Sequence, residues 1–208
     1  MSLGKVLDNL KQYEVFLAGK GVAGVIVRHD LGYHFYTEDC PRLIDDLHSH
    51  KRSYTSYIEY GEVRNHIYEI KGINPVGGKF LMNIGCEFLC GKGGCAPHQI
   101  AQANLNVEKV DEITTRQGES YSLTYDQFHK FELLSKGPVV TRMTYSRIMQ
   151  PNTQIIVDRD YVMSKCCPPF ATESELWDMV ESCLAPAWEN AESSSTFEYE
   201  LIDGKVVG

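Results

Sequence analysis

The sequence predicts a mainly β protein, a sandwich or barrel with helices only near its two ends. Short runs rich in aromatic and β-branched residues recur through the middle of the chain, and glycine and proline turn signals separate them. Helical periodicity is confined to the two ends. At 208 residues, the chain is long enough for one sizeable core, so we expect a single domain over 1–208.

The two ends each predict one helix. The first is expected over 1–21, ended by glycines at 19 and 21, because apolar side chains recur at helical spacing there: Leu3, Val6, Leu7, Leu10 and Leu17. The second is expected over 172–190, because Thr172 and Glu175 form a capping box before an apolar stripe. Pro186 is expected to interrupt that stripe.

A β-barrel is expected over 22–160, interrupted by a glycine- and cysteine-rich insertion at about 71–103. Within the insertion, one strand is expected at 79–84. The other strands are expected at 22–27, 33–37, 54–60, 63–70, 107–114, 119–124, 127–134, 139–145 and 154–157.

Composition excludes some classes of function. The formal charge of -8 argues against broad nucleic-acid binding, which needs a basic surface. No stretch approaches the roughly 20 apolar residues that cross a bilayer, and the start of the chain lacks the pattern of a secretion signal. The seven cysteines are scattered and odd in number, so we expect reduced thiols in a cytoplasmic protein with neither nucleic acid nor membrane as partner.

The strongest indication of a functional site is a pair of histidines, His48 and His50, together with His129 later in the sequence. Residues i and i+2 of a strand face the same side, about 7 Å apart along the backbone. Both imidazoles can therefore converge on one ion, and a barrel can supply His129 from another strand. The alternative is three polar strand residues with no ion, but the joint pattern favours a metal site.

These two blocks resemble the two motifs of the cupin superfamily. The first block is His48-Ser49-His50 followed by Tyr54 and Gly61, and the second runs from Gly118 to His129 without the family's usual Pro-x-Gly. The resemblance covers roughly 41–145. It implies a cupin-like double-stranded β-helix, a jelly-roll barrel, between the terminal helices, with dimerisation through an edge strand as an option.

Tyr54 stands where the family has a glutamate ligand, which leaves three neutral histidines. Such a set resembles the site of cysteine dioxygenase and related thiol or diketone oxygenases, as does His129 followed by Glu132. The resemblance implies iron(II), with zinc, nickel or manganese as alternatives, and a dioxygenase reaction on a small-molecule substrate. Without a carboxylate the ion keeps its full charge, which favours an anionic substrate.

Strand parity adds candidates for catalysis and substrate binding. If pairing is regular, Arg52 and Tyr54 follow the histidines on the inner face, where Arg52 could clamp a substrate carboxylate and Tyr54 could donate a hydrogen bond to bound oxygen. Parity also places Tyr125 and Gln127 on the face of His129, and either Tyr145 or Arg142 can reach the pocket. The plainer alternatives are an ion pair for Arg52 and packing at the edge of the core for the tyrosines.

A second cluster of metal-binding residue types lies in the insertion. Cys86, Cys90, Cys95 and His98 could close a structural zinc site. Their spacing is not that of a common zinc knuckle, so free thiols in a glycine-rich loop are the alternative.

Two functions of different classes remain open at this stage. One is an iron(II) dioxygenase; the other is a non-oxygenase cupin-like module that binds a small ligand or sugar, isomerises a substrate, or has no catalytic activity. The fold that the resemblance implies hosts both, so the fold alone does not decide between them.

Overall fold

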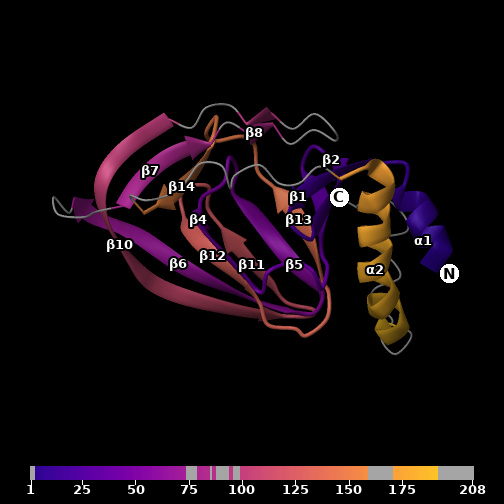
Figure 1. Ribbon diagram of the computed structural model, residues 1–208. Coiled ribbons are helices and arrows are strands. Elements are labelled where there is room, and N and C mark those ends of the chain that lie inside the picture. Colours follow the sequence, from indigo (N-terminus) through magenta and orange to yellow (C-terminus); the bar gives the residue numbers. More distant parts are fainter. Residues whose placement is uncertain are drawn as a thin grey trace.

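The computed structural model describes residues 3–73, 79–84, 86–87, 94–95, 99–158 and 171–191. Within these residues the chain is almost entirely β, with one helix near each end (Figure 1). The elements are α1 (Leu3–Leu10), β1 (Glu14–Gly19), β2 (Val22–Arg28), β3 (Leu31–Tyr36), β4 (Leu43–His48), β5 (Tyr54–Tyr60), β6 (Glu62–Ile73), β7 (Lys79–Ile84), β8 (Cys86–Glu87), β9 (Gly94–Cys95), β10 (Gln99–Arg116), β11 (Ser120–Leu123), β12 (Phe128–Leu133), β13 (Val139–Tyr145), β14 (Thr153–Val157) and α2 (Glu173–Ala191).

The strands form two large antiparallel arrays, which confirms the mainly β prediction. One is a closed barrel in the order β10-β6-β12-β4-β14-β7, and the other is a six-stranded sheet in the order β1-β2-β3-β13-β5-β11. A short hairpin of β8 and β9 is separate from both. Each array also pairs strands that are far apart in the sequence, such as β12 with β4 in the barrel and β13 with β3 in the sheet.

Two layers of apolar side chains hold these parts together. One layer lies where α1 and α2 cover one side of the sheet (Figure 1), and it buries Val25, Phe35 and Val140 of the sheet against Leu176 and Val180 of α2. The other joins the sheet to the barrel; its members include Tyr36, Ile58, Val63, Phe131 and Leu133. Burial of this apolar surface is the main favourable contribution to folding. Neither helix of the described residues is long and apolar enough to cross a membrane.

The predicted first helix over 1–21 is wrong in extent. The helix ends at Leu10, and Glu14–Gly19 forms β1, whose Val15 pairs with Val25 of β2. Leu17 matches the helical spacing by coincidence, because pairing with β2 outweighs local periodicity. Gly21 does adopt a left-handed conformation, with φ of 69°, but it serves the β1–β2 turn. A Cβ there would lie 2.4 Å from the backbone nitrogen of Cys40, so only glycine fits.

The expected insertion at 71–103 is partly wrong as well. β6 continues to Ile73, β10 begins at Gln99, and the predicted strand Lys79–Ile84 forms as β7 and closes the barrel between β10 and β14. Much of this stretch is therefore a barrel wall. α2 continues through Pro186 to Ala191, close to the expected range of 172–190; Pro186 has no backbone N–H to donate to the ladder, but it does not end the helix.

The capping box at the start of α2 is confirmed. The Thr172 hydroxyl accepts the backbone N–H of Glu175 at 3.3 Å, and the Glu175 carboxylate accepts the backbone N–H of Thr172 at 2.7 Å. These hydrogen bonds, above all that from the Thr172 backbone, lower the pKa of Glu175. The box therefore satisfies backbone donors that the first turn of a helix leaves free.

We expect Thr172→Ala to lower the free energy of unfolding by about 1 kcal/mol, the usual contribution of a threonine N-cap. The measurement is urea unfolding followed by circular dichroism. Thr172→Ser is the matched control, because it keeps the accepting hydroxyl and should stay within about 0.5 kcal/mol of the wild type. Equal losses in both variants would contradict the assignment of the cap.

Candidate metal centre

The three predicted histidines come together at one end of the barrel. His129 lies on β12 directly opposite His48, the last residue of β4, and His50 follows two residues beyond the strand end. The ring centroids lie 4.6 Å apart for His48 and His129, 4.9 Å for His48 and His50, and 5.1 Å for His50 and His129. One ligand nitrogen from each ring falls within 4.8 Å of the others. The sequence prediction of this cluster is confirmed.

Hydrogen bonds on the far side of two rings turn their Nε2 atoms towards the cluster. Nδ1 of His129 lies 2.8 Å from Oδ1 of Asn65, and Nδ1 of His48 lies 2.8 Å from the backbone oxygen of Asp46. A carbonyl oxygen only accepts, so each Nδ1 carries the proton and each neutral ring keeps the Nε2 lone pair free. Such outer hydrogen bonds fix the tautomer and orientation of metal-binding histidines.

All three imidazoles are held in their neutral form. Burial is the main cause that lowers the pKa of His48, His50 and His129, and the neighbouring histidines add to the effect on His50 and His129. A neutral imidazole is the form that binds a metal. The centre therefore needs no prior loss of protons before it can take up a cation.

The donor set fits a divalent transition metal. Nε2 of His50 lies 2.9 Å from Nε2 of His129, and with metal–nitrogen bonds of about 2.1 Å, two ligands at a right angle would lie about 3.0 Å apart. No two ligands of one ion lie further apart than about 4.2 Å, so nitrogens separated by 4.8 Å have to approach by at least about 0.6 Å. Imidazole nitrogens suit iron, zinc, copper and nickel. The three histidines could therefore hold one divalent metal ion.

Sequence reasoning missed the residues that hold His50 in place. The side-chain amide of Gln150 donates to the backbone oxygen of His50 at 2.7 Å and contacts the Ser49 hydroxyl at 3.2 Å. The backbone N–H of His50 donates to the oxygen of Tyr125 at 3.3 Å. These bonds fix a loop that has no strand partner of its own. Neither Gln150 nor Asn65 has a spacing in the sequence that relates it to a histidine.

Tyr54 lies beside the cluster, as predicted. It is the first residue of β5 and is buried, and its ring meets the His50 ring edge-on at a centroid distance of 4.7 Å. Burial raises the pKa of Tyr54 well above its ordinary value, and the neighbouring Tyr121 and Tyr36 raise it further. The hydroxyl therefore stays protonated and can donate a hydrogen bond.

Strand parity does not apply to Arg52, Tyr125 or Gln127, because none of them lies in a strand, and their roles in catalysis and substrate binding stay predictions. Arg52 lies in the loop between β4 and β5, where its guanidinium donates to the backbone oxygen of His29. Tyr125 and Gln127 precede β12, and the side-chain oxygen of Gln127 accepts the backbone N–H of Thr124. β12 begins only at Phe128 because a turn closes at 124–127.

Of the two candidates on β13, Tyr145 points inward and Arg142 outward. Tyr145 pairs with Tyr54 across the sheet, with ring centroids 6.5 Å apart. Arg142 instead binds the carboxylate of Glu59 at 2.7 Å and lies over the ring of Tyr57. Their spacing of three residues places them on opposite faces of the strand.

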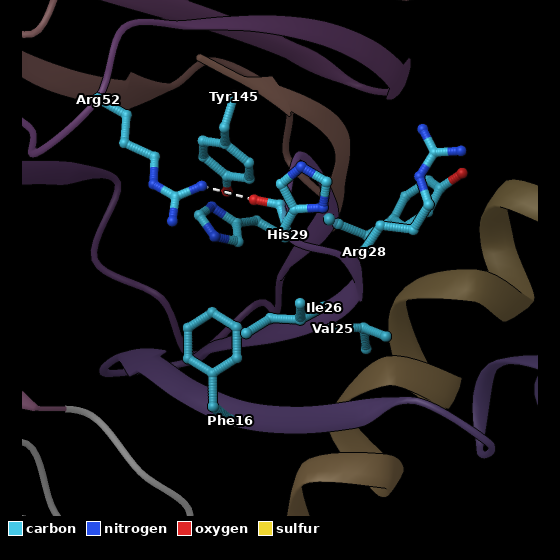
Figure 2. Close-up of a pocket in the computed structure, with 10 residues that line it drawn as sticks. Phe16, Val25, Ile26, Arg28, His29, Arg52 and Tyr145 are labelled. Carbon is cyan, nitrogen blue, oxygen red and sulfur yellow. Dashed lines mark hydrogen bonds between the residues drawn. The ribbon is translucent and has the colours of Figure 1, made fainter. Parts of the chain in front are cut away.

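A pocket of about 250 Å³ opens next to this region (Figure 2). Arg52, His34 and Tyr145 line it, whereas none of the three clustered histidines does. His34 lies on β3, with its ring edge-on to that of Phe16 at a centroid distance of 6.2 Å. Burial lowers the pKa of His34 to about 4.

The second predicted metal site lies largely outside the described residues. Cys86 and Cys95 occupy paired backbone positions of β8 and β9, while Cys90 and His98 are not described. In the described part of the chain, His48, His50 and His129 form the one group of three or more histidine, cysteine or acidic residues that could hold a metal.

Comparison with known proteins shows no matching family model and no matching curated protein. Among solved structures, the chain is similar to the cupin domain of CENP-C from Drosophila melanogaster, with 9% identity, a TM-score of 0.37, and coverage of 64% of this chain and 75% of the other. It is similar to a hydroquinone 1,2-dioxygenase from a Sphingomonas species at 13% identity, a TM-score of 0.35 and 67% of each chain. It is also similar to oxalate decarboxylase from Bacillus subtilis at 12% identity and a TM-score of 0.39, over 69% of this chain and 30% of the other. Likenesses at this level assign neither a family nor an activity.

We expect Asn65→Ala to weaken metal binding by about 10- to 100-fold, because His129 would lose the acceptor that orients it. Titration of the metal-free protein with cobalt(II), followed by absorbance, measures this. Asn65→Asp keeps an acceptor oxygen at the same place and should retain most of the affinity. Equal cobalt affinity in wild type and Asn65→Ala would show that Asn65 does not orient a ligand.

We expect His34 to make the stability of the metal-free protein depend on pH. Its folded pKa of about 4 lies below the ordinary histidine pKa of 6.5, so the unfolded chain binds the proton more readily. The stabilisation of the folded state by the neutral His34 ring is complete above about pH 6.5 and is lost as pH falls towards 4. It amounts to roughly 2–3 kcal/mol for a well-shielded ring. Urea unfolding at pH 7 and pH 4.5 should show a smaller loss for His34→Phe than for wild type; equal losses would contradict this.

Proposed function

We propose that this protein is an iron(II)-dependent dioxygenase that acts on a small anionic substrate at His48, His50 and His129. The observation that carries the proposal is the convergence of three neutral imidazoles with no carboxylate in the cluster. Iron(II) bound there would keep its full positive charge and would supply the redox chemistry that dioxygen activation requires. Zinc, nickel and manganese are alternative ions for the same three nitrogen ligands.

The surrounding residues support an anionic substrate and a dry site. Tyr54 is buried against His50 and keeps its proton, so it can donate a hydrogen bond to a negatively charged oxygen or sulfur. Tyr121 and Tyr145 pack around Tyr54, with ring centroids at 6.1 and 6.5 Å. These rings exclude water from one side of the centre, which strengthens electrostatic interactions within it.

One observation favours a second candidate, a cupin-like module that binds a small ligand without oxygenase activity. The pocket described above is lined by none of the three histidines. A ligand could therefore bind there without entering the coordination sphere of a metal. The same two alternatives arose from the sequence, and metal content and oxygen uptake separate them.

Protein purified without chelators should contain close to one equivalent of a first-row divalent metal, and His129→Ala should lose most of it, because two histidines remain. Elemental analysis measures both. His66→Ala is the matched control, because His66 lies on the same barrel but binds Glu112 and Glu132; it should keep its metal. A wild-type protein that contains no metal and cannot be reconstituted would rule the proposal out.

Oxygen uptake by the iron-loaded protein then tests the reaction class. A panel of small thiols, diketones and aromatic acids, offered one at a time, should include a compound that drives uptake in wild type and not in His129→Ala. Metal-loaded protein that consumes no oxygen with any of them would favour the ligand-binding alternative.

A further inference from the structure

The pocket beside the metal centre combines aromatic rings with an arginine that is free to bind an anion. Of its ten lining residues, none is acidic, although the chain carries a formal charge of -8. Phe16, Tyr33, His34 and Tyr145 present rings to it. An electropositive hollow on an acidic protein selects for negatively charged ligands.

Arg52 is the cation of this pocket. Its guanidinium donates one hydrogen bond to the backbone oxygen of His29 (Figure 2), and no carboxylate pairs with it within the described ranges. A guanidinium has five N–H donors in a fork that matches a carboxylate, so most of its donors remain for a ligand. Arg28 also lines the pocket, but it is exposed and its charge is paired with Asp30 at 3.1 Å.

Gly24 leaves room for the Phe16 ring at one side of the pocket. Phe16 of β1 pairs with Gly24 of β2, and a Cβ at Gly24 would lie 2.3 Å from the tip of the Phe16 ring. The ring can therefore lie flat across β2. In Figure 2, Phe16 and Ile26 lie on one side of the hollow, and Arg52, Tyr145 and His29 lie on the other. A ligand between them would contact apolar side chains on one side and Arg52 and Tyr145 on the other.

Two connections link the pocket to the three histidines. Tyr145 is a wall of the pocket and packs against Tyr54, whose ring meets that of His50. Arg52 follows His50 by two residues, in the loop that Gln150 holds. A ligand in the pocket would therefore lie beside the metal centre, separated from it by these tyrosine rings.

We propose that this pocket binds a small aromatic carboxylate, with the carboxylate on Arg52 and the ring between Phe16 and Tyr145. At about 250 Å³, it is smaller than the roughly 300–1,000 Å³ of drug-sized sites, which limits the ligand to a single ring. The proposal goes beyond the proposed function and does not place this ligand on the metal ion. Binding itself requires only the pocket.

Calorimetric titration of the metal-free protein with benzoate, benzamide and cyclohexanecarboxylate tests the ligand class without any variant. Benzoate should bind at least tenfold more tightly than benzamide, which lacks the charge, and more tightly than cyclohexanecarboxylate, which lacks the planar ring. Equal binding of benzoate and benzamide, or no binding of benzoate, would overturn the proposal.

Two variants locate the site. Arg52→Met should weaken benzoate binding at least tenfold, while Arg116→Met, the matched control outside the pocket, should change it less than twofold. Gly24→Ala should also weaken binding, because the added methyl group pushes the Phe16 ring into the hollow. Thermal unfolding checks that each variant is folded. Benzoate binding that is unaffected by both Arg52→Met and Gly24→Ala would place the ligand elsewhere and overturn the proposal.

A final measurement separates this inference from the proposed function. Cobalt(II) binding to wild type tests the metal centre alone, and benzoate binding to the metal-free protein tests the pocket alone. If both bind, benzoate should alter the visible spectrum of the cobalt-loaded protein, because the two sites are adjacent. An unchanged spectrum with benzoate bound would overturn the inference that the ligand lies beside the metal centre.

Discussion

The register of β12 against its two neighbours is the constraint on which the metal centre depends. His129 lies opposite His48 of β4 and opposite Ile67 of β6, so both edges of the strand are fixed. Buried Phe131 and Leu133 hold the same face towards the core. A slip of one residue would turn His129 outward and expose those apolar side chains. The apolar core therefore specifies the position of the polar site.

The outer surface of the barrel carries charged side chains, whereas its interior carries neutral ones. On β6, β10 and β12, Arg64 and His66 bind the carboxylates of Glu112 and Glu132 at 3.1–3.6 Å. Glu132, three residues after His129 in the sequence, is thus committed to this outer network. The interior keeps neutral imidazoles and protonated tyrosines, because burial disfavours every charged form. An ion bound there would be the dominant local charge.

Predictions from the sequence were correct inside regular strands and helices, and they were wrong where a strand or helix pattern was extended past its end. His48 and His129 were placed correctly, because they lie on paired strands, and the capping box of α2 is where the sequence predicted it. Arg52 and Gln127 were misplaced because alternation was carried past the ends of β4 and β12 into a loop and a turn. Leu17 was assigned to a helix because its spacing fits one, although its backbone pairs with Ala23 of β2.

The sequence by itself determined the class of fold and the three clustered histidines, since both depend on local patterns: strand alternation, turn residues and a His-x-His pair. Only the tertiary structure decided what surrounds those histidines. Asn65 lies 64 residues from His129 in the sequence, and Gln150 lies 100 residues from His50. His34 lies 16 residues from His50. Closure of the barrel and pairing of β13 with β3 and β5 bring such distant residues together, and no local spacing encodes those contacts.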